Sequence, residues 1–202
     1  MLKRVKALFT GDKFGSVEEK IPLVIIKLEG TLNKLNKIST ILINEDRELF
    51  EKCIDSRVRN DFVHAMMYAN ECAEIRKIAH MLVSSRYALE QMVLRLRTII
   101  KLSDLLVTMS PVIDVIKETQ HKLVGLVPSA ANNLNEANQI LNKCFENMGT
   151  NAISAVNPMV YGEGAKKVLE EAEMVAEETI RERFPAIPET KPQRLSEAEM
   201  LA

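Results

Sequence analysis

Residues 16–43, SVEEKIPLVIIKLEGTLNKLNKISTILI, decide the fold because their apolar side chains recur in alternating steps of four and three. This spacing is the heptad pattern of a helix that packs along one seam against another helix. The seam consists of Val17, Ile21, Val24, Leu28, Leu35, Ile38 and Leu42, with Thr31 in its one polar position. Ser16 and Glu19 fit a capping box at the start of this helix. Pro22 predicts either that a short turn precedes a helix starting near that residue or that the helix kinks there.

A second heptad seam follows a turn that we predict at residues 44–47. It lies in a helix from about residue 48 to residue 101 and consists of Val58, Phe62, Ala65, Ala69, Cys72, Ile75, Ala79, Leu82, Leu89, Val93, Leu96 and Ile100, with Arg86 in the gap. No Gly or Pro interrupts residues 31–110. A helix of that length reaches roughly 80 Å at about 1.5 Å per residue, which a compact core does not need. The sequence therefore predicts an all-α fold built on a long antiparallel two-helix hairpin over residues 16–101.

The composition agrees with long helices and excludes several other classes. Of 202 residues, 47% are hydrophobic but only 4% are aromatic, and there are seven Gly, seven Pro and no Trp. β-Sandwiches and barrels use more aromatic residues and more turns. No stretch approaches the roughly 18 to 20 apolar residues of a membrane span, and Cys53, Cys72 and Cys144 are too few for a disulfide framework. We therefore expect a soluble, cytoplasmic protein with reduced thiols in its core.

The rest of the chain divides into shorter segments. Smaller helices complete a predicted helical core at residues 16–148, and the last of them carries on one face Leu134, Ala137, Leu141, Phe145 and Met148. Residues 149–164 are predicted to be a linker because they hold three of the seven Gly. Residues 165–183 predict an acidic helix, and residues 184–202 form a flexible, proline-containing tail.

The charge is divided between the two halves of the chain. Residues 1–101 carry 18 Lys and Arg against 13 Asp and Glu, whereas residues 102–202 carry 9 against 15. A basic half suits an anionic surface, and the acidic half can fold onto it. We hypothesise that residues 163–182 close against the hairpin in a soluble monomer. Because charge contacts are screened beyond about 8 to 10 Å, closure also needs apolar docking by Val168, Leu169, Val175 and Ile180.

The first ten residues, MLKRVKALFT, predict a short basic amphipathic helix. On a helical wheel one arc holds Met1, Leu2, Val5, Leu8 and Phe9, and outside it lie Lys3, Arg4 and Lys6. One such helix binds a membrane weakly, but many copies linked in a polymer bind firmly. The segment is therefore of most use to a protein that self-assembles, although a core-docked start is an alternative.

Residues 184–192, FPAIPETKP, alternate apolar side chains with prolines. Prolines restrict the chain before binding, so less entropy is lost when it docks on a partner. The segment follows the acidic arm, as a peptide ligand for another protein would. A disordered terminus without a partner is the alternative.

Signals of catalysis are nearly absent. The sequence has no Gly-rich phosphate loop, no GxSxG and no HExxH, and it lacks the paired Glu-x-x-His motifs of a metal-binding bundle. His64, His80 and His121 are scattered, and we interpret Asp61 with His64 as a surface pair. We expect no enzyme, no metal site and no cofactor.

These features together resemble the ESCRT-III family, and most closely the archaeal ESCRT-III-like cell-division (Cdv) proteins. Four of them occur in the family's order: the basic amphipathic start, the long basic hairpin, the smaller helices with an acidic arm, and FPAIPETKP. The last looks like the type-2 MIT-interacting motif of that family. Only about ten residues follow Pro192, too few for the C-terminal winged helix of some archaeal members, so the chain resembles a shorter paralogue.

The resemblance implies a non-enzymatic subunit of a filament that it forms with itself and with paralogous subunits. Such filaments polymerise on anionic membranes and constrict or sever membrane necks in cell division or vesicle budding, and an AAA ATPase with an MIT domain disassembles them. The implied membrane-binding residues are Met1, Leu2, Lys3, Arg4, Val5, Lys6, Leu8 and Phe9. The implied MIT-binding residues are Phe184, Pro185, Ile187, Pro188 and Pro192.

Two other classes of protein also have long basic helices and are alternatives. One is a membrane-curving helical dimer similar to BAR-type proteins, which has no reason to carry the proline motif. The other is a structural coiled-coil protein without membrane affinity. Nucleic acid is not an expected partner, because acidic residues dilute the basic ones and aromatic residues are sparse.

Overall fold

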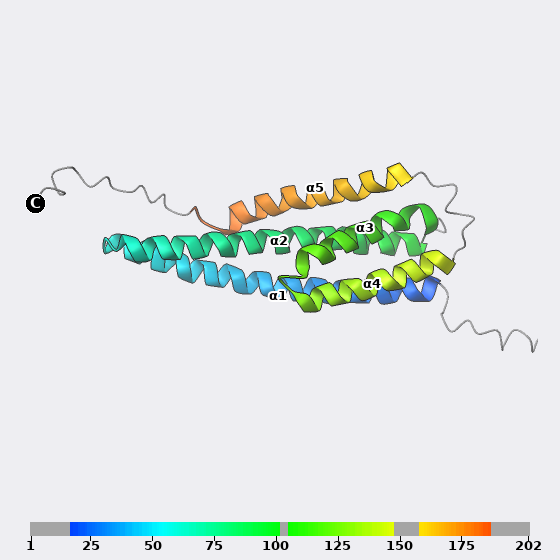
Figure 1. Cartoon of the computed structure of the whole chain (residues 1–202), viewed down its shortest axis with the longest axis horizontal. Helices are drawn as coiled ribbons and strands as arrows, with labels where there is room; N and C mark the ends of the chain where they lie inside the picture. The colour runs from blue at the N-terminus through cyan, green and yellow to red at the C-terminus, as the bar shows by residue number, and fades with distance from the viewer. Residues whose placement is uncertain (1–16, 102–104, 148–157, 187–202) are drawn as a thin grey trace, which may run out of the picture.

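The computed structural model describes residues 17–101, 105–147 and 158–186, and nearly all of them are helical. Figure 1 shows two long antiparallel helices, α1 (Val17–Val58) and α2 (Phe62–Lys101), which form a rod. Three shorter helices lie along it: α3 (Leu105–Leu123), α4 (Pro128–Asn147) and α5 (Pro158–Arg183). The described residues contain no strand, so the prediction of an all-α fold built on a helical hairpin is confirmed.

The seam between α1 and α2 follows the predicted heptads along most of its length. The buried seam residues are Ile21, Val24, Leu28, Thr31 and Leu35 on α1 and Ala65, Cys72, Ala79, Leu82, Leu89, Val93 and Leu96 on α2. The one polar member, Thr31, is satisfied within its own helix, because its hydroxyl donates a hydrogen bond to the Lys27 carbonyl at 3.0 Å. Two predicted members, Val58 and Phe62, are exposed instead, because they flank the turn of the hairpin.

The position that we predict for the turn, residues 44–47, is wrong, because α1 continues to Val58. The chain reverses at Arg59–Asp61, where Asn60 has a φ of 60°. The Asn60 amide donates to the Arg57 carbonyl at 3.0 Å and the Asp61 amide to the Ser56 carbonyl at 2.8 Å, which is the Schellman pattern of a helix end. Asp61 then caps α2, since its Oδ1 accepts a hydrogen bond from the His64 amide at 3.2 Å.

Two prolines lie inside helices. Pro22 is in α1, which already begins at Val17, so the predicted start near Pro22 is wrong. Pro22 is exposed and lacks the N–H that would bond to the preceding turn, so α1 loses one hydrogen bond near its start. Pro111 also lies inside a helix, α3, but it is buried, and its side chain packs beside Gly164 of α5.

The short helices share one hydrophobic core with the end of the hairpin that lies opposite its turn, where α1 begins and α2 ends. The predicted face of α4 is buried at Leu134, Ala137 and Leu141, and Lys27 of α1 pairs with Glu136 of α4.

The predicted linker, 149–164, is too long, because α5 begins at Pro158. A side-chain Cβ at position 164 would lie 3.7 Å from Pro111 Cγ, so this glycine belongs to a packed helix rather than to a turn. Within the described ranges, no helix combines the length and apolarity needed to cross a bilayer.

Replacing Leu89 by Ala should lower the free energy of unfolding by about 2 to 5 kcal/mol, because it opens a cavity in the fully buried seam. Replacing Leu94 by Ala on the same helix should change it by less than about 0.5 kcal/mol, since Leu94 is 62% exposed. Urea unfolding of both variants measures the difference. Equal losses in the two variants would contradict the assignment of the seam.

Candidate functional site

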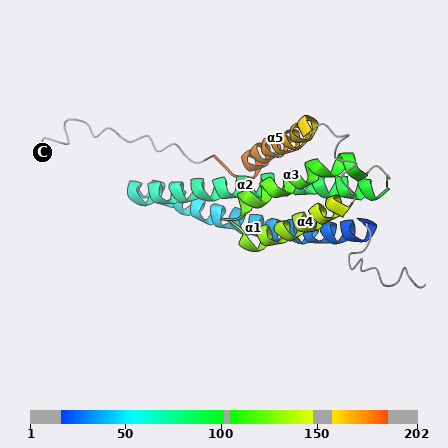
Figure 2. The same cartoon turned by 45° about the vertical axis from the view of Figure 1, so that its right-hand side comes forward.

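The acidic helix α5 lies along the outer face of α2 and also contacts α3 (Figures 1 and 2). The residues of α5 that face the core recur every three or four positions and are small or medium in size: Ala165, Val168, Ala172, Ala176 and Thr179. Of the predicted docking residues, Val168 is buried, whereas Leu169, Val175 and Ile180 are half-buried. In the structure, α5 is therefore packed against the hairpin, as hypothesised. Alanine side chains form much of the interface.

Ion pairs add little to this docking. The carboxylate of Glu173 accepts a hydrogen bond from Lys122 Nζ of α3 at 2.7 Å and lies 3.6 Å from His80 Nδ1 of α2. Burial raises the pKa of Glu173, but hydrogen bonds from Lys122 and Ser84, together with the charges of Lys122 and His80, outweigh it and hold this pKa below its usual value. The resulting stabilisation is present above the unfolded pKa and is lost as the pH falls through the lowered one. All three side chains are partly exposed, so each contact contributes at most about 1 kcal/mol.

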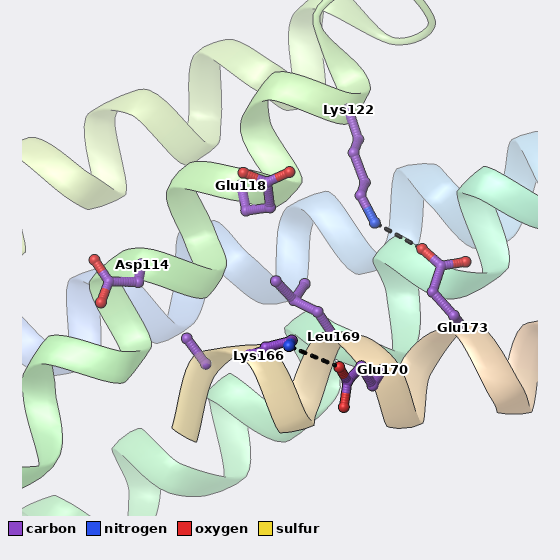
Figure 3. A pocket seen from close by; sticks show the side chains of 8 residues that line it. Asp114, Glu118, Lys122, Lys166, Leu169, Glu170 and Glu173 are labelled. Atoms are coloured by element: carbon purple, nitrogen blue, oxygen red, sulfur yellow. Dashed lines mark hydrogen bonds and ion pairs between the residues drawn. The ribbon is translucent and has the colours of Figure 1, made fainter. Parts of the chain in front are cut away.

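A pocket of about 440 Å³ lies between α3 and α5 and is lined mainly by charged residues (Figure 3). Its lining consists of Asp114, Glu118, Lys122, Ala165, Lys166, Leu169, Glu170 and Glu173. Lys122 pairs with Glu173, and Lys166 Nζ lies 3.7 Å from Glu170 Oε1. Burial raises the pKa of Asp114, and the nearby Lys117 opposes that shift. Among the described residues, no group of three His, Cys, Asp or Glu side chains is placed to hold a metal ion.

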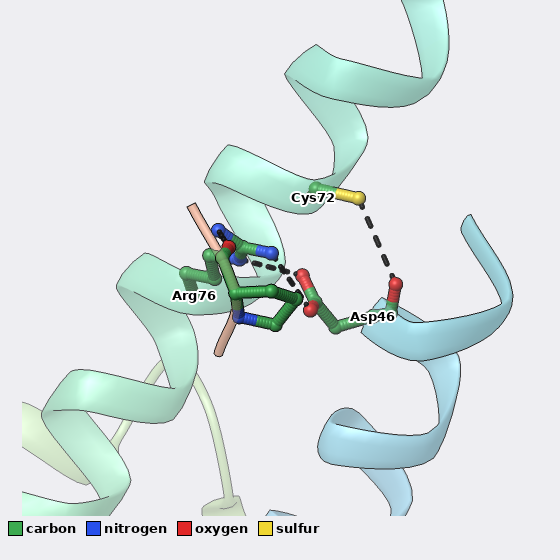
Figure 4. Close-up of polar contacts among 4 residues, drawn as sticks. Asp46, Cys72 and Arg76 are labelled. Carbon is green, nitrogen blue, oxygen red and sulfur yellow. Dashed lines mark hydrogen bonds and ion pairs between the residues drawn. The ribbon is translucent and has the colours of Figure 1, made fainter. Parts of the chain in front are cut away.

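Arg76 of α2 joins α1, α2 and the end of α5 (Figure 4). Its Nε and Nη2 donate to the two carboxylate oxygens of Asp46 at 2.8 and 3.0 Å, and its Nη1 donates to the Pro185 carbonyl at 2.6 Å. The guanidinium also lies over the rings of Phe50 and Phe184, at 5.9 and 5.5 Å from their centroids. Sequence reasoning missed this cluster. A turn placed at residues 59–61 would have indicated it, because Asp46 and Arg76 then lie at similar distances from the turn, 14 residues before and 16 residues after Asn60.

The structure brings two of the predicted partner-binding residues onto the hairpin. Phe184 is only 6% exposed, and Pro185 is held through its carbonyl. Ile187, Pro188 and Pro192 lie outside the described residues, as does the whole predicted membrane-binding segment 1–10. Their roles stay predictions.

The three cysteines are free and buried, as expected of core residues. Burial, aided by the charge of Asp46, raises the pKa of Cys72 to about 11. A thiol with such a pKa is almost entirely protonated near neutral pH and is a poor nucleophile. Cys72 is therefore not a candidate for covalent chemistry.

Replacing Ala172 by Glu should release α5 from the hairpin. Ala172 is fully buried in the shared core, and an unpaired carboxylate there costs several kcal/mol. We expect the backbone amides of residues 165–183 to exchange hydrogen about tenfold faster or more, as measured by mass spectrometry. Met174→Glu is the matched control, because Met174 is two residues away and points to solvent. Equal protection in both variants would contradict the docking described here.

Comparison with known proteins supplies the family. None of the family models compared matches the sequence, and no solved structure matches it. The chain is 40% identical to cell division protein B1 of Sulfolobus acidocaldarius over 147 residues, which cover 71% of this chain and 67% of that protein. It is 28% identical to cell division protein B of the same organism over 190 residues, which cover 93% and 73% of the two chains. With this similarity and a helical hairpin fold, the chain belongs to the archaeal ESCRT-III-like cell-division (Cdv) proteins.

Proposed function

We propose that this chain is a non-enzymatic filament subunit that polymerises on anionic membranes and constricts or severs membrane necks in archaeal cell division or vesicle budding. The observation that carries the proposal is a rod-like hairpin with large apolar side chains uncovered along its length. In a filament, neighbouring copies or paralogous subunits would cover them. They include Leu23, Ile26, Ile41, Ile54, Val58, Phe62, Val63, Met66, Met67 and Leu94.

Membrane attachment would come from the residues that precede α1. Met1, Leu2, Val5, Leu8 and Phe9 would enter the lipid, while Lys3, Arg4 and Lys6 would lie at anionic headgroups, each contributing about 1 kcal/mol. Helix formation and the loss of free motion offset much of that gain. A single copy therefore binds weakly, and a filament that presents many copies on one surface binds firmly.

Removal of subunits would depend on the tail. The motif FPAIPETKP would bind the MIT domain of an AAA ATPase through Phe184, Pro185, Ile187, Pro188 and Pro192. In the closed subunit the first of these residues is buried against Arg76, so the partner and the hairpin compete for it. Release of α5 would free both the motif and the face of α2 beneath α5.

The membrane proposal predicts that Leu2→Asp combined with Phe9→Asp weakens binding to anionic phospholipid vesicles about tenfold or more, because each apolar side chain contributes about 1.5 to 3 kcal/mol when fully buried. Thr10→Asp is the control, since it adds a carboxylate outside the apolar arc. Vesicle sedimentation measures binding, and electron microscopy of the same samples shows whether filaments form. Unchanged sedimentation of the double variant would remove residues 1–10 from the proposal.

The tail proposal predicts that a peptide of residues 183–193 binds an MIT domain of an archaeal AAA ATPase. Ile187→Asp should weaken this binding about tenfold or more, because a charge replaces an apolar anchor. Thr190→Ala in the same peptide should change it little. Calorimetric titration measures both. A peptide that does not bind, in a protein that still binds vesicles, would favour the BAR-like alternative.

A further inference from the structure

The outer face of α4 is lined by amide side chains. Four of them are exposed and fall within one arc of about 80° on a helical wheel with about 100° per residue; they are Asn132, Asn135, Gln139 and Asn142. Their spacing of three, four and three residues is that of the a and d positions of a heptad. We call these four residues the amide ridge. It extends about 15 Å along the helix axis.

The amide ridge differs from the outer face of α5, because it contains no charged residue. The described exposed positions of α5 are charged, apart from Met174. Asparagine is among the weaker helix formers, so Glu, Lys or Arg would favour the helix more at these positions. Within the described part of the chain, none of the four amides has a hydrogen-bond partner. Neither helix formation nor an intramolecular contact therefore accounts for the ridge.

The ridge lies away from the face that α5 covers. α4 packs against α1 and α3, whereas α5 packs against α2 and α3. Figures 1 and 2 both show α4 and α5 on opposite sides of the rod. Glu136, which lies next to the ridge, is already paired with Lys27 of α1. The ridge is therefore accessible while α5 is docked, and release of α5 alone would not cover it.

We propose that the amide ridge binds the same ridge of a second copy of this chain, with the two α4 helices antiparallel. An amide both donates and accepts hydrogen bonds, so a row of amides complements a copy of itself, as a row of like charges cannot. The spacing of three, four and three reads the same in both directions. An antiparallel pair therefore brings Asn132 opposite Asn142 of the second copy. It also brings Asn135 opposite Gln139 of the second copy, so every layer of the contact holds two amides.

The antiparallel orientation follows from the helix dipoles. Two parallel helices place like ends of their dipoles side by side, whereas an antiparallel pair places the positive end of each beside the negative end of the other. A twofold axis then relates the two copies, so the same residues form both sides of the contact.

The chemistry of the ridge favours a second copy over other classes of partner. Anionic lipid and nucleic acid are bound mainly through Lys and Arg, which the ridge lacks. A charged protein surface would lose water from its charges without meeting an opposite charge. An apolar surface would leave the amides without hydrogen bonds. A second ridge supplies a donor and an acceptor at every position.

The contact is small. A strip about 15 Å long and about 10 Å wide, which is the diameter of a helix, covers roughly a few hundred Å² on the two copies together. Stable interfaces bury about 1,200 Å² or more. We therefore expect a transient pair in solution, which persists when a filament aligns many copies. That persistence rests on the proposed function, whereas the pairing itself does not.

Disulfide trapping in the full chain tests the pairing, because a covalent bond accumulates transient contacts. Asn135→Cys and Gln139→Cys, mixed in equal amounts and oxidised with copper phenanthroline, should form a linked dimer about tenfold faster or more than either variant alone. In the mixed pair the two new thiols share one layer. In a pair of identical variants they are offset by about 6 Å along the axis, which disfavours a disulfide.

Two controls accompany this mixture. Ser129→Cys mixed with Gln139→Cys should react as slowly as the single variants, because Ser129 is exposed but lies outside the arc. The parent chain should not form a linked dimer, since its three cysteines are buried. Circular dichroism melting temperatures equal to that of the parent chain establish that the variants are folded.

Charges in the outer layers give a second readout. When Asn132→Glu and Asn142→Glu are added to both cysteine variants, each outer layer holds two carboxylates, and trapping should slow about threefold or more. Asn132→Glu with Asn142→Lys places opposite charges in these layers and should not slow it.

Three outcomes would overturn the inference. They are a mixture that forms no more dimer than the parent chain, equal rates in the mixture and in the Ser129 control, and faster trapping of one variant alone, which would indicate parallel helices. Because the experiment uses no lipid, it can fail while vesicle sedimentation succeeds, so the pairing and the membrane proposal are tested separately.

Discussion

The register between α1 and α2 underlies everything else in the structure, and the Asp46–Arg76 pair fixes it. A heptad seam of Leu, Val and Ala packs almost equally well after a shift of seven residues, so apolar contacts alone specify the register weakly. The Asp46 side chain is 2% exposed, and a shifted register would leave it charged, buried and unpaired at a cost of several kcal/mol. The Schellman turn at Asn60 sets the same register from the end of the hairpin.

The sequence predicts the parts of this fold that depend on periodicity. Burial of Leu28, Leu35, Leu82 and Leu89 follows from spacing alone, because a helix surface repeats regularly. The turn was misplaced because Asn44 and Asp46 are weak helix formers and occur together in a polar run. A partner thirty residues away keeps Asp46 helical, and local propensity contains no information about that partner. The start of α5 was misplaced for a related reason, since Gly164 is explained by its contact with Pro111.

The sequence indicates which segments form the candidate site, but not which side chains make the contacts. The apolar positions of the acidic helix indicate that it docks, and Val168 does so, yet the sequence does not show that alanines would form the closest contacts. Nor does it show that Phe184 would lie on Arg76, because that contact joins residues more than one hundred positions apart. Pattern analysis therefore identified the interacting segments, whereas the tertiary structure was needed to pair them.

The orientation of α5 has a mechanical consequence. Its C-terminal end, beside Arg76, lies nearest the hairpin turn, and the tail leaves from that end. A force that draws the tail away from the rod therefore loads the Phe184 and Pro185 contacts first and then unzips the helix from α2 one turn at a time. Unzipping breaks only a few contacts per step, whereas shearing would break them all together, so opening the subunit from this end needs less force than sliding α5 along the rod.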